Sequence, residues 1–169
     1  DIWVVDSGTG GDEEIVGTGL DGQPMTATLG MSARVVRISG ADGTQTDVAT
    51  LPSINLGTEA EGGSRLAQLR GITYVTAPGW HPGMAPSTAE EPLPLTGSLL
   101  RIAPSGEAVV AVPMWQYERD NDTDNELDNH PYGLFATDDG ALLMTDAGGN
   151  NLYRVNPASR RAKLLATFD

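Results

Sequence analysis

Residues 131–150 read PYGLFATDDGALLMTDAGGN and predict the fold of this protein. Two apolar runs, 134–136 and 142–145, flank the tripeptide Asp138-Asp139-Gly140. Asp and Gly tolerate the positive φ angles of tight hairpin turns, so these runs are expected to pair as a β-hairpin. Further short strands are expected at 151–155 and 162–168. Together the four strands predict one small antiparallel meander.

The same meander recurs along the chain. Segments 2–8, 72–78 and 142–148 read IWVVDSG, ITYVTAP and LLMTDAG, and Asp6, Thr76 and Asp146 lie 70 residues apart (76 − 6 and 146 − 76). The next strand recurs in the segments VRI, LRI and YRV, which begin at Val36, Leu100 and Tyr153. A Gly- or Pro-bearing turn and a fourth strand follow each copy. Repeated four-stranded units are typical of β-propeller blades; a two-sheet sandwich is the alternative.

The repeats define the expected domain organisation. The sequence predicts an all-β chain forming one partial β-propeller, with four-stranded antiparallel blades at about 1–51, 64–113 and 131–169. The first blade is expected to lack its innermost strand, since the chain starts inside a second strand. A propeller of this type closes with about six blades. We therefore expect remaining blades of the same propeller, or another protein chain, to cover the end faces, so that these residues are not a free monomer.

Composition narrows the function classes. With 21 Gly, 11 Pro and 5% aromatic residues in 169, the chain favours many short strands and turns over a helical bundle. No apolar run approaches the roughly 18 residues of a membrane-spanning helix. The net charge of −13 argues against nucleic acid and anionic membrane surfaces as partners. The absence of Cys excludes disulfides, thiol catalysis and thiolate metal sites.

Loop lengths predict where binding takes place. The long connections 9–32, 52–63, 77–96 and 114–130 all leave the predicted blades on one face, and every other connection is a tight turn. Long loops on a rigid scaffold are where binding and catalysis concentrate. We call this the loop-bearing face and expect a ligand or partner there; the alternative is that the loops are merely tolerated insertions.

Four motifs carry a resemblance to a known family. They are Ser7-Gly8-Thr9-Gly10-Gly11, Leu51-Pro52-Ser53, segment 129–134 (NHPYGL) and segment 145–152 (TDAGGNNL). In combination they resemble the ScyD/ScyE family of exported bacterial proteins, whose founding members are associated with scytonemin biosynthesis. The resemblance implies a six-bladed propeller related to NHL-type and gluconolactonase-like propellers, of which this chain covers about half. It also implies a secreted, periplasmic or cell-surface location. His130 departs from the small or polar residue expected at its position.

Several polar residues are candidates for the site. Asp6 and Asp146 end equivalent strands before Gly-rich turns, where Asp commonly accepts hydrogen bonds from backbone N–H groups. The two histidines, His81 and His130, fall in loops of the loop-bearing face. Histidine with nearby carboxylates can ligate a metal or act as acid and base. The residues expected to form the ligand-binding face are Glu118, Asn129, His130, Asp146, Asn150 and His81.

One acidic segment suggests calcium. Asp120, Asp122 and Asp124 have the alternating spacing with which a calcium loop directs oxygen atoms at the ion. The segment is not an EF-hand, because Asn125 replaces the Gly of the sharp turn and Pro131 stands where the closing Glu would be. A solvated acidic loop is the alternative. Calcium is therefore the one cofactor that the sequence suggests.

Two functions stay open at this point. The first is an exported scaffold that binds a ligand or a partner through its loop-bearing face. The second is a calcium-dependent hydrolase of the gluconolactonase-like kind, with Glu118, Asn129 and Asp146 among its ligands. The sequence shows no acid of the first blade near the expected central channel, which favours binding over catalysis.

Overall fold

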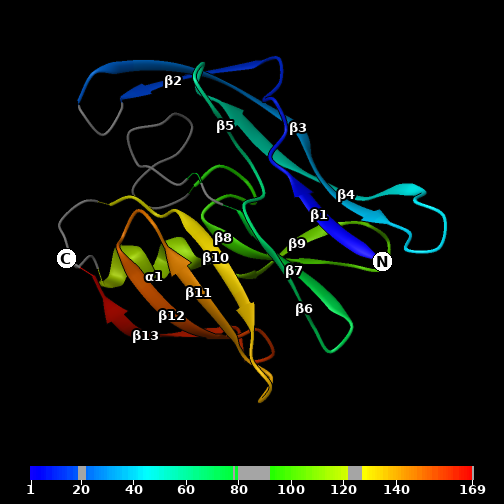
Figure 1. Cartoon of the computed structure of the whole chain (residues 1–169). Helices are drawn as coiled ribbons and strands as arrows, with labels where there is room; N and C mark the ends of the chain where they lie inside the picture. Colours follow the sequence, from blue (N-terminus) through cyan, green and yellow to red (C-terminus); the bar gives the residue numbers. More distant parts are fainter. Residues whose placement is uncertain (19–21, 78, 80–91, 122–126, 169) are drawn as a thin grey trace.

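A computed structural model describes residues 1–18, 22–77, 79, 92–121 and 127–168. In these residues the chain forms thirteen β-strands and a single helix. The strands assemble into three antiparallel sheets, which we number in chain order (Figure 1). The predicted all-β class with blade-like sheets is confirmed. Closure into a full propeller stays a prediction.

Sheet 3 is the meander predicted from residues 131–150. Its strands pair in sequence order and are β10 (Pro131–Ala136), β11 (Leu142–Asp146), β12 (Asn151–Asn156) and β13 (Arg161–Thr167). The β10–β11 turn closes through the Gly140 N–H, which donates to the Thr137 carbonyl at 3.0 Å. Gly140 has a φ of 88°, the left-handed conformation that the Asp-Gly turn predicts.

Sheet 2 repeats this arrangement in the middle of the chain. Its strands also pair in sequence order and are β6 (Leu66–Leu69), β7 (Ile72–Ala77), β8 (Ser98–Ile102) and β9 (Ala108–Val112). Each of them lies where the repeat predicts a strand.

Sheet 1 has five strands. The path is β1 (Ile2–Asp6), β3 (Pro24–Ile38), β4 (Gln45–Asn55) and β5 (Ala60–Glu61), and β2 (Glu13–Thr18) pairs with the first half of β3. Within the described part of the chain, β1 pairs on one side only, with β3. This agrees with a first blade that lacks its innermost strand.

The prediction of a long loop over residues 9–32 is wrong, because most of these residues form a β-hairpin. Strand β2 pairs with β3 in the register Ile15↔Ala27, and both side chains are buried with Ile54 and Leu93 in a small separate core. Ile, Val and Thr supply the strand propensity of this hairpin, and the contacts with Ile54 and Leu93, which are distant in sequence, bury its apolar side chains. Strand β4 likewise continues beyond Leu51, the end expected from the sequence.

The acidic connection 114–130 is also not wholly irregular, because it begins with helix α1 (Met114–Asn121). Met114 and Glu118, one helical turn apart, are both fully buried. The helix is fastened to sheet 3 where the Tyr117 hydroxyl accepts a hydrogen bond from the Ala162 N–H at 2.9 Å. So short a helix depends on such tertiary contacts for its stability.

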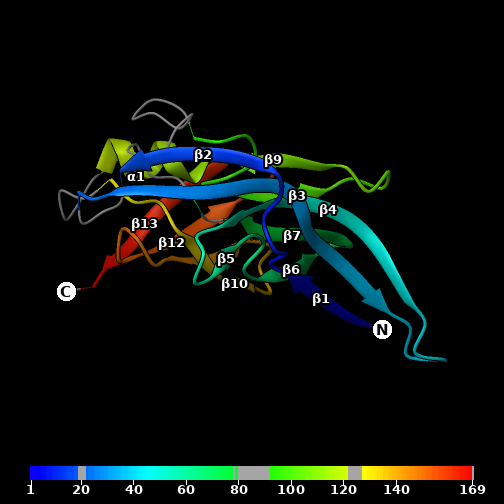
Figure 2. The ribbon, with the colours of Figure 1, turned by 90° about the horizontal axis from the view of Figure 1, so that it is seen from above.

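Sheet 2 lies between sheets 1 and 3. One of its faces packs against sheet 1 around Leu51, Val75 and Leu100, and the other packs against sheet 3 around Tyr74, Leu142 and Met144. The first strand of sheet 2, β6, contacts both β1 and β10. Figures 1 and 2 show the three sheets fanning out from these adjacent strands.

The two ends of the sheets differ as the loop lengths predict. The tight turns β3–β4, β6–β7, β10–β11 and β12–β13 point toward the lower right of Figure 1. The β2–β3 hairpin and helix α1 lie at the opposite end. The inserted elements therefore gather on one face, and this face carries the candidate site.

Candidate functional site

Asp146, at the end of β11, organises the start of β10. Its Oδ1 accepts hydrogen bonds from the backbone N–H groups of His130 at 2.7 Å, Gly148 at 3.2 Å and Gly149 at 3.3 Å. Its Oδ2 accepts one from Asn129 Nδ2. The residue is only 2% exposed, and burial raises the pKa of this carboxyl to about 6 against the opposing effect of the backbone donors.

In sheets 1 and 2, the residues at the position equivalent to Asp146 also form hydrogen bonds to neighbouring chain segments. Asp6 accepts hydrogen bonds from the Gly8 N–H at 3.0 Å and from Arg34 Nη2 at 2.8 Å. Thr76 is fully buried, and its hydroxyl accepts from the Arg65 N–H at 3.0 Å and donates to the Tyr132 carbonyl at 2.8 Å. The backbone-bonding role expected for Asp6 and Asp146 is therefore present in the structure.

Three predicted site residues lie inside the protein. Glu118, Asn129 and Asp146 are buried beside the 147–150 turn, and a Cβ added to Gly149 would collide with the Glu118 carboxylate. The pKa of Tyr153 is raised by burial and by the nearby charges of Glu118 and Asp146. These side chains therefore form a polar interior of sheet 3 rather than an open surface.

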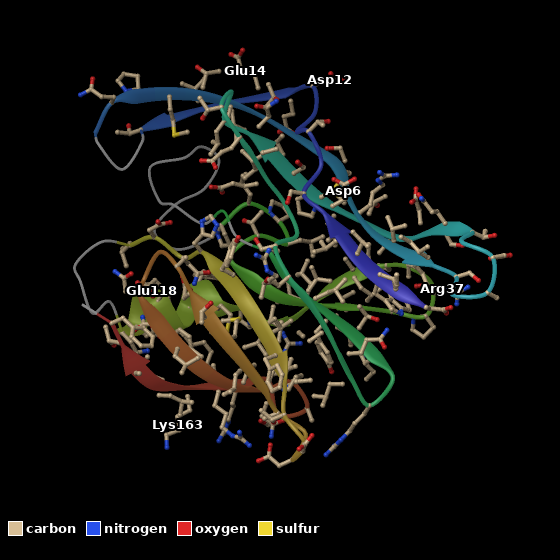
Figure 3. All side chains as sticks on the ribbon, viewed as in Figure 1. Asp6, Asp12, Glu14, Arg37, Glu118 and Lys163 are labelled. Atoms are coloured by element: carbon tan, nitrogen blue, oxygen red, sulfur yellow. The ribbon has the colours of Figure 1, made fainter. Side chains whose placement is uncertain are left out.

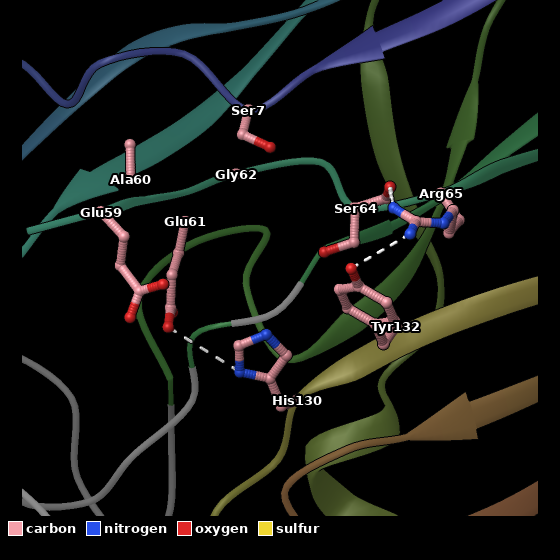
Figure 4. Close-up of a pocket in the computed structure, with 9 residues that line it drawn as sticks. All are labelled: Ser7, Glu59, Ala60, Glu61, Gly62, Ser64, Arg65, His130 and Tyr132. Atoms are coloured by element: carbon pink, nitrogen blue, oxygen red, sulfur yellow. Dashed lines mark hydrogen bonds and ion pairs between the residues drawn. The ribbon is translucent and has the colours of Figure 1, made fainter.

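A pocket lies where the connection between sheets 1 and 2 meets the start of sheet 3 (Figure 4). Its volume is about 270 Å³. We call it the junction pocket, and its lining residues are Ser7, Glu59, Ala60, Glu61, Gly62, Ser64, Arg65, His130 and Tyr132. The pocket combines carboxylates, hydroxyls, an imidazole and a guanidinium from three separate segments of the chain.

One wall of the junction pocket is acidic. His130 Nδ1 lies 3.8 Å from Glu61 Oε1, and the two side chains are 25% and 21% exposed. Burial raises the pKa of the Glu61 carboxyl, the His130 imidazole lowers it, and the charges of Asp128 and Glu59 raise it further. In Figure 4 Glu59 and Glu61 point the same way, and the His130 ring faces Glu61.

The opposite wall is a cation stacked on an aromatic ring. The Arg65 guanidinium carbon lies 4.5 Å from the centre of the Tyr132 ring, within cation–π range. Arg65 Nη2 also donates to the Tyr132 hydroxyl at 3.0 Å, and Nη1 donates to the Ser64 carbonyl at 2.7 Å. These bonds hold the Arg65 side chain in one orientation beside the pocket (Figure 4).

The remaining predicted residues are dispersed. Asn150 is exposed in the turn after β11, with a φ of 51°. Asp120 lies in helix α1 and pairs with Arg119 at 3.1 Å. His81, Asp122 and Asp124 lie outside the described residues. In the part of the chain that the structure describes, no three His, Asp or Glu side chains approach closely enough to hold a metal ion.

Sequence reasoning missed Glu59, Glu61, Arg65 and Tyr132. Glu61 belongs to β5 of sheet 1, beyond the 1–51 range expected for the first blade, and it places a carboxylate in the junction pocket. The spacing Glu59-Ala60-Glu61 before Gly62-Gly63 is a usable signal. A Cβ on Gly62 would collide with the Ser7 carbonyl, so glycine here lets the connection pass close to β1.

Comparison with known proteins gives no relative. No family model matches the chain. No curated protein and no solved structure matches it either. Among the residues that the structure describes, helix α1 is the one helix, and it is too short and too polar to cross a membrane.

Proposed function

We propose that this protein is an exported binding module of the β-propeller type, related to the ScyD/ScyE family, which holds a small polar ligand in the junction pocket. The observation that carries the proposal is the pocket itself. It opens among elements from separate parts of the chain, and its walls offer both hydrogen-bond donors and acceptors. Concave sites with a few convergent polar groups are where ligands bind.

The walls of the junction pocket are held in place before any ligand arrives. The Thr76 hydroxyl forms hydrogen bonds with the backbones of both Arg65 and Tyr132, and the Asp146 carboxylate accepts one from the backbone of His130. Preorganised walls reduce the ordering entropy that binding must overcome. A rigid pocket of this kind supports selective binding of a small molecule.

The contacts of Ser7 and Asp146 favour binding over hydrolysis. The Ser7 hydroxyl donates to the Gly63 carbonyl at 3.2 Å, so its proton already serves a structural bond. For a calcium-dependent hydrolase, Asp146 would be a ligand, but its Oδ1 accepts backbone N–H groups, including that of His130, and its Oδ2 accepts the side-chain amide of Asn129. These residues as arranged do not fit a calcium site, and no catalytic step is assigned to them.

A ligand screen by saturation-transfer NMR tests the proposal. Small polar molecules that bind the wild-type protein are expected to lose their signal with Glu61→Gln and with Tyr132→Ala. Glu14→Gln, the same chemical change at an exposed residue of β2 outside the pocket, is the matched control and should leave binding intact. Ligands that bind all three variants equally would show that the junction pocket is not the site.

A lactone and ester hydrolysis panel, run with and without calcium, separates the alternative function. The binding module is expected to leave every substrate intact. Turnover that requires calcium and is lost with Asp146→Asn would favour the hydrolase instead.

A further inference from the structure

The middle sheet shows what a fully covered blade of this protein looks like. Along β7, Val75 and Ala77 face sheet 1, and Ile72 and Tyr74 face sheet 3. From Thr73 to Ala77 every residue of the strand is buried. A strand with apolar side chains on both faces is stable in water only when a layer covers each face.

The outer sheets have the same two-faced composition but only one covered face. In β1, Trp3 and Val5 pack toward sheet 2, whereas Ile2 is 62% exposed and Val4 is 39% exposed. In β10, Leu134 and Ala136 pack toward sheet 2, whereas Phe135 between them is 65% exposed. The outer sheets thus each present apolar side chains that face no other sheet in the described structure.

We call the uncovered face of sheet 1 the first end face. It carries apolar side chains, and its charged side chains are mainly acidic. The strand register aligns Ile2 with Ile38, Val4 with Val36, and Asp6 with Arg34 across β1 and β3, and Val36 with Asp47 across β3 and β4. Arg34 pairs with both acids, at 2.8 Å to Asp6 and 3.4 Å to Asp47. Two carboxylates against one guanidinium leave this face with an excess of negative charge.

The uncovered face of sheet 3, the last end face, is apolar and basic. The register aligns Phe135 with Leu143, Leu143 with Arg154, and Arg154 with Lys163 across the four strands. Ala162 and Leu164 pack toward sheet 2, so the alternation of β13 turns Arg161 and Lys163 outward. Figure 3 shows Lys163 pointing away from the rest of the molecule. Of these basic residues, Arg154 forms an ion pair, with Asp139. The last end face therefore carries an excess of positive charge, although the whole chain has a net charge of −13.

We propose that a second copy of this chain covers these faces, with the last end face of each copy against the first end face of the other. Apolar rows would meet apolar rows, and basic strands would meet acidic ones. The contact continues the face-to-face stacking that already joins sheets 1, 2 and 3. Two copies of three sheets bring six sheets into one ring, within the usual propeller range of about four to eight blades. A head-to-tail contact that closes in this way ends growth at the dimer.

Light scattering on the whole chain, with three exposed apolar-to-acid variants, tests this pairing. The wild type is expected to have twice the mass of one chain. Phe135→Glu on the last end face and Val4→Glu on the first end face should each give monomers. Val16→Glu, on strand β2 at the opposite end of sheet 1 from β1 (Figure 1) and 53% exposed in the wild type, is the matched control and should stay dimeric.

Mixing the two monomeric variants identifies the head-to-tail arrangement. A mixture of Phe135→Glu and Val4→Glu chains retains one intact pairing, between the unchanged last end face of one and the unchanged first end face of the other. The mixture is therefore expected to recover dimers. A monomeric wild type, open-ended larger assemblies, dissociation by Val16→Glu, or no recovery on mixing would each overturn the proposal.

Discussion

The backbone of His130 is hydrogen-bonded to the side chain of Asp146 and to the backbone of the residue that follows it. The His130 N–H donates to Asp146 Oδ1 at 2.7 Å, and the His130 carbonyl accepts the N–H of Ala147, the next residue after Asp146, at 2.9 Å. Because His130 also faces Glu61 in the junction pocket, a buried carboxyl of sheet 3 sets the position of a pocket wall. The protonation state of Asp146 is therefore tied to both stability and pocket geometry.

The first prediction concerns pH. The pKa of Asp146 rises from an ordinary value of 3.8 to about 6 on folding, so the folded state holds this proton more tightly. The stabilisation by this group is complete below about pH 4 and is lost as the pH rises through about 6, a change of about 3 kcal/mol. Urea unfolding of Asp146→Asn between pH 4 and 7 should lack that fall.

The slope with pH, rather than absolute stability, is the readout for Asp146→Asn. Asp138→Asn, in an exposed turn, is the control and should keep the wild-type slope. Identical slopes for all three proteins would show that Asp146 does not titrate in this range.

The second prediction concerns the buried Thr76 hydroxyl. Thr76→Val keeps the shape of the side chain but leaves the Arg65 N–H and the Tyr132 carbonyl without their partner. The free energy of unfolding should fall by about 1–3 kcal/mol, measured by urea denaturation. Thr50→Val, at an exposed strand position, should change it far less, and equal effects would contradict the bridging role.

The third prediction concerns the tight turn of sheet 3. Gly140 has a φ of 88°, and a Cβ there would collide with the Arg70 guanidinium. Gly140→Val should lower the free energy of unfolding by about 1–3 kcal/mol, because a β-branched residue resists this conformation. In an Arg70→Ala background the collision is removed but the backbone strain persists, so most of the loss should remain. Melting like the wild type would refute the turn assignment.

The fourth prediction concerns calcium. The spacing of Asp120, Asp122 and Asp124 predicts binding of this ion by the 120–128 segment. Isothermal calorimetry should show heat with the wild type and none with Asp122→Asn, while Asp139→Asn in a distant turn behaves as the wild type. No heat, together with a thermal midpoint unchanged by chelator, would remove calcium from consideration.

Much of the fold could be predicted because the repeat places equivalent strands at equal spacing. The strands around Val75 and Met144 combine apolar runs with turn residues on both sides, and such local signals decide short meanders. Strand β2 and helix α1 escaped prediction for a different reason. Ile15 and Met114 are stabilised by residues distant in sequence, such as Ile54 and Tyr153. The local sequence pattern does not indicate those contacts.

The candidate site was predicted only in part. His130 was identified because histidine is rare in this sequence, and Asp146 because it precedes a Gly-rich turn. Glu61 and Arg65 could not be placed, since the pocket depends on how the connection between sheets 1 and 2 lies against β10. Glu118 was expected on the ligand-binding face because its segment is acidic, whereas it lies one helical turn from Met114 and is buried with it.

Strand β3 is shared between two hydrophobic cores, so its two halves are expected to open with different free energies. Its first half packs through Ala27 in the small core with Ile15, and its second half packs through Val35 in the core between sheets 1 and 2. Between them Gly30 passes so close to Gly11 that neither tolerates a Cβ. Amide hydrogens in the first half should exchange with deuterium through local opening of the hairpin, while those around Val35 exchange only when sheets 1 and 2 separate. One continuous strand would thus report two different opening free energies.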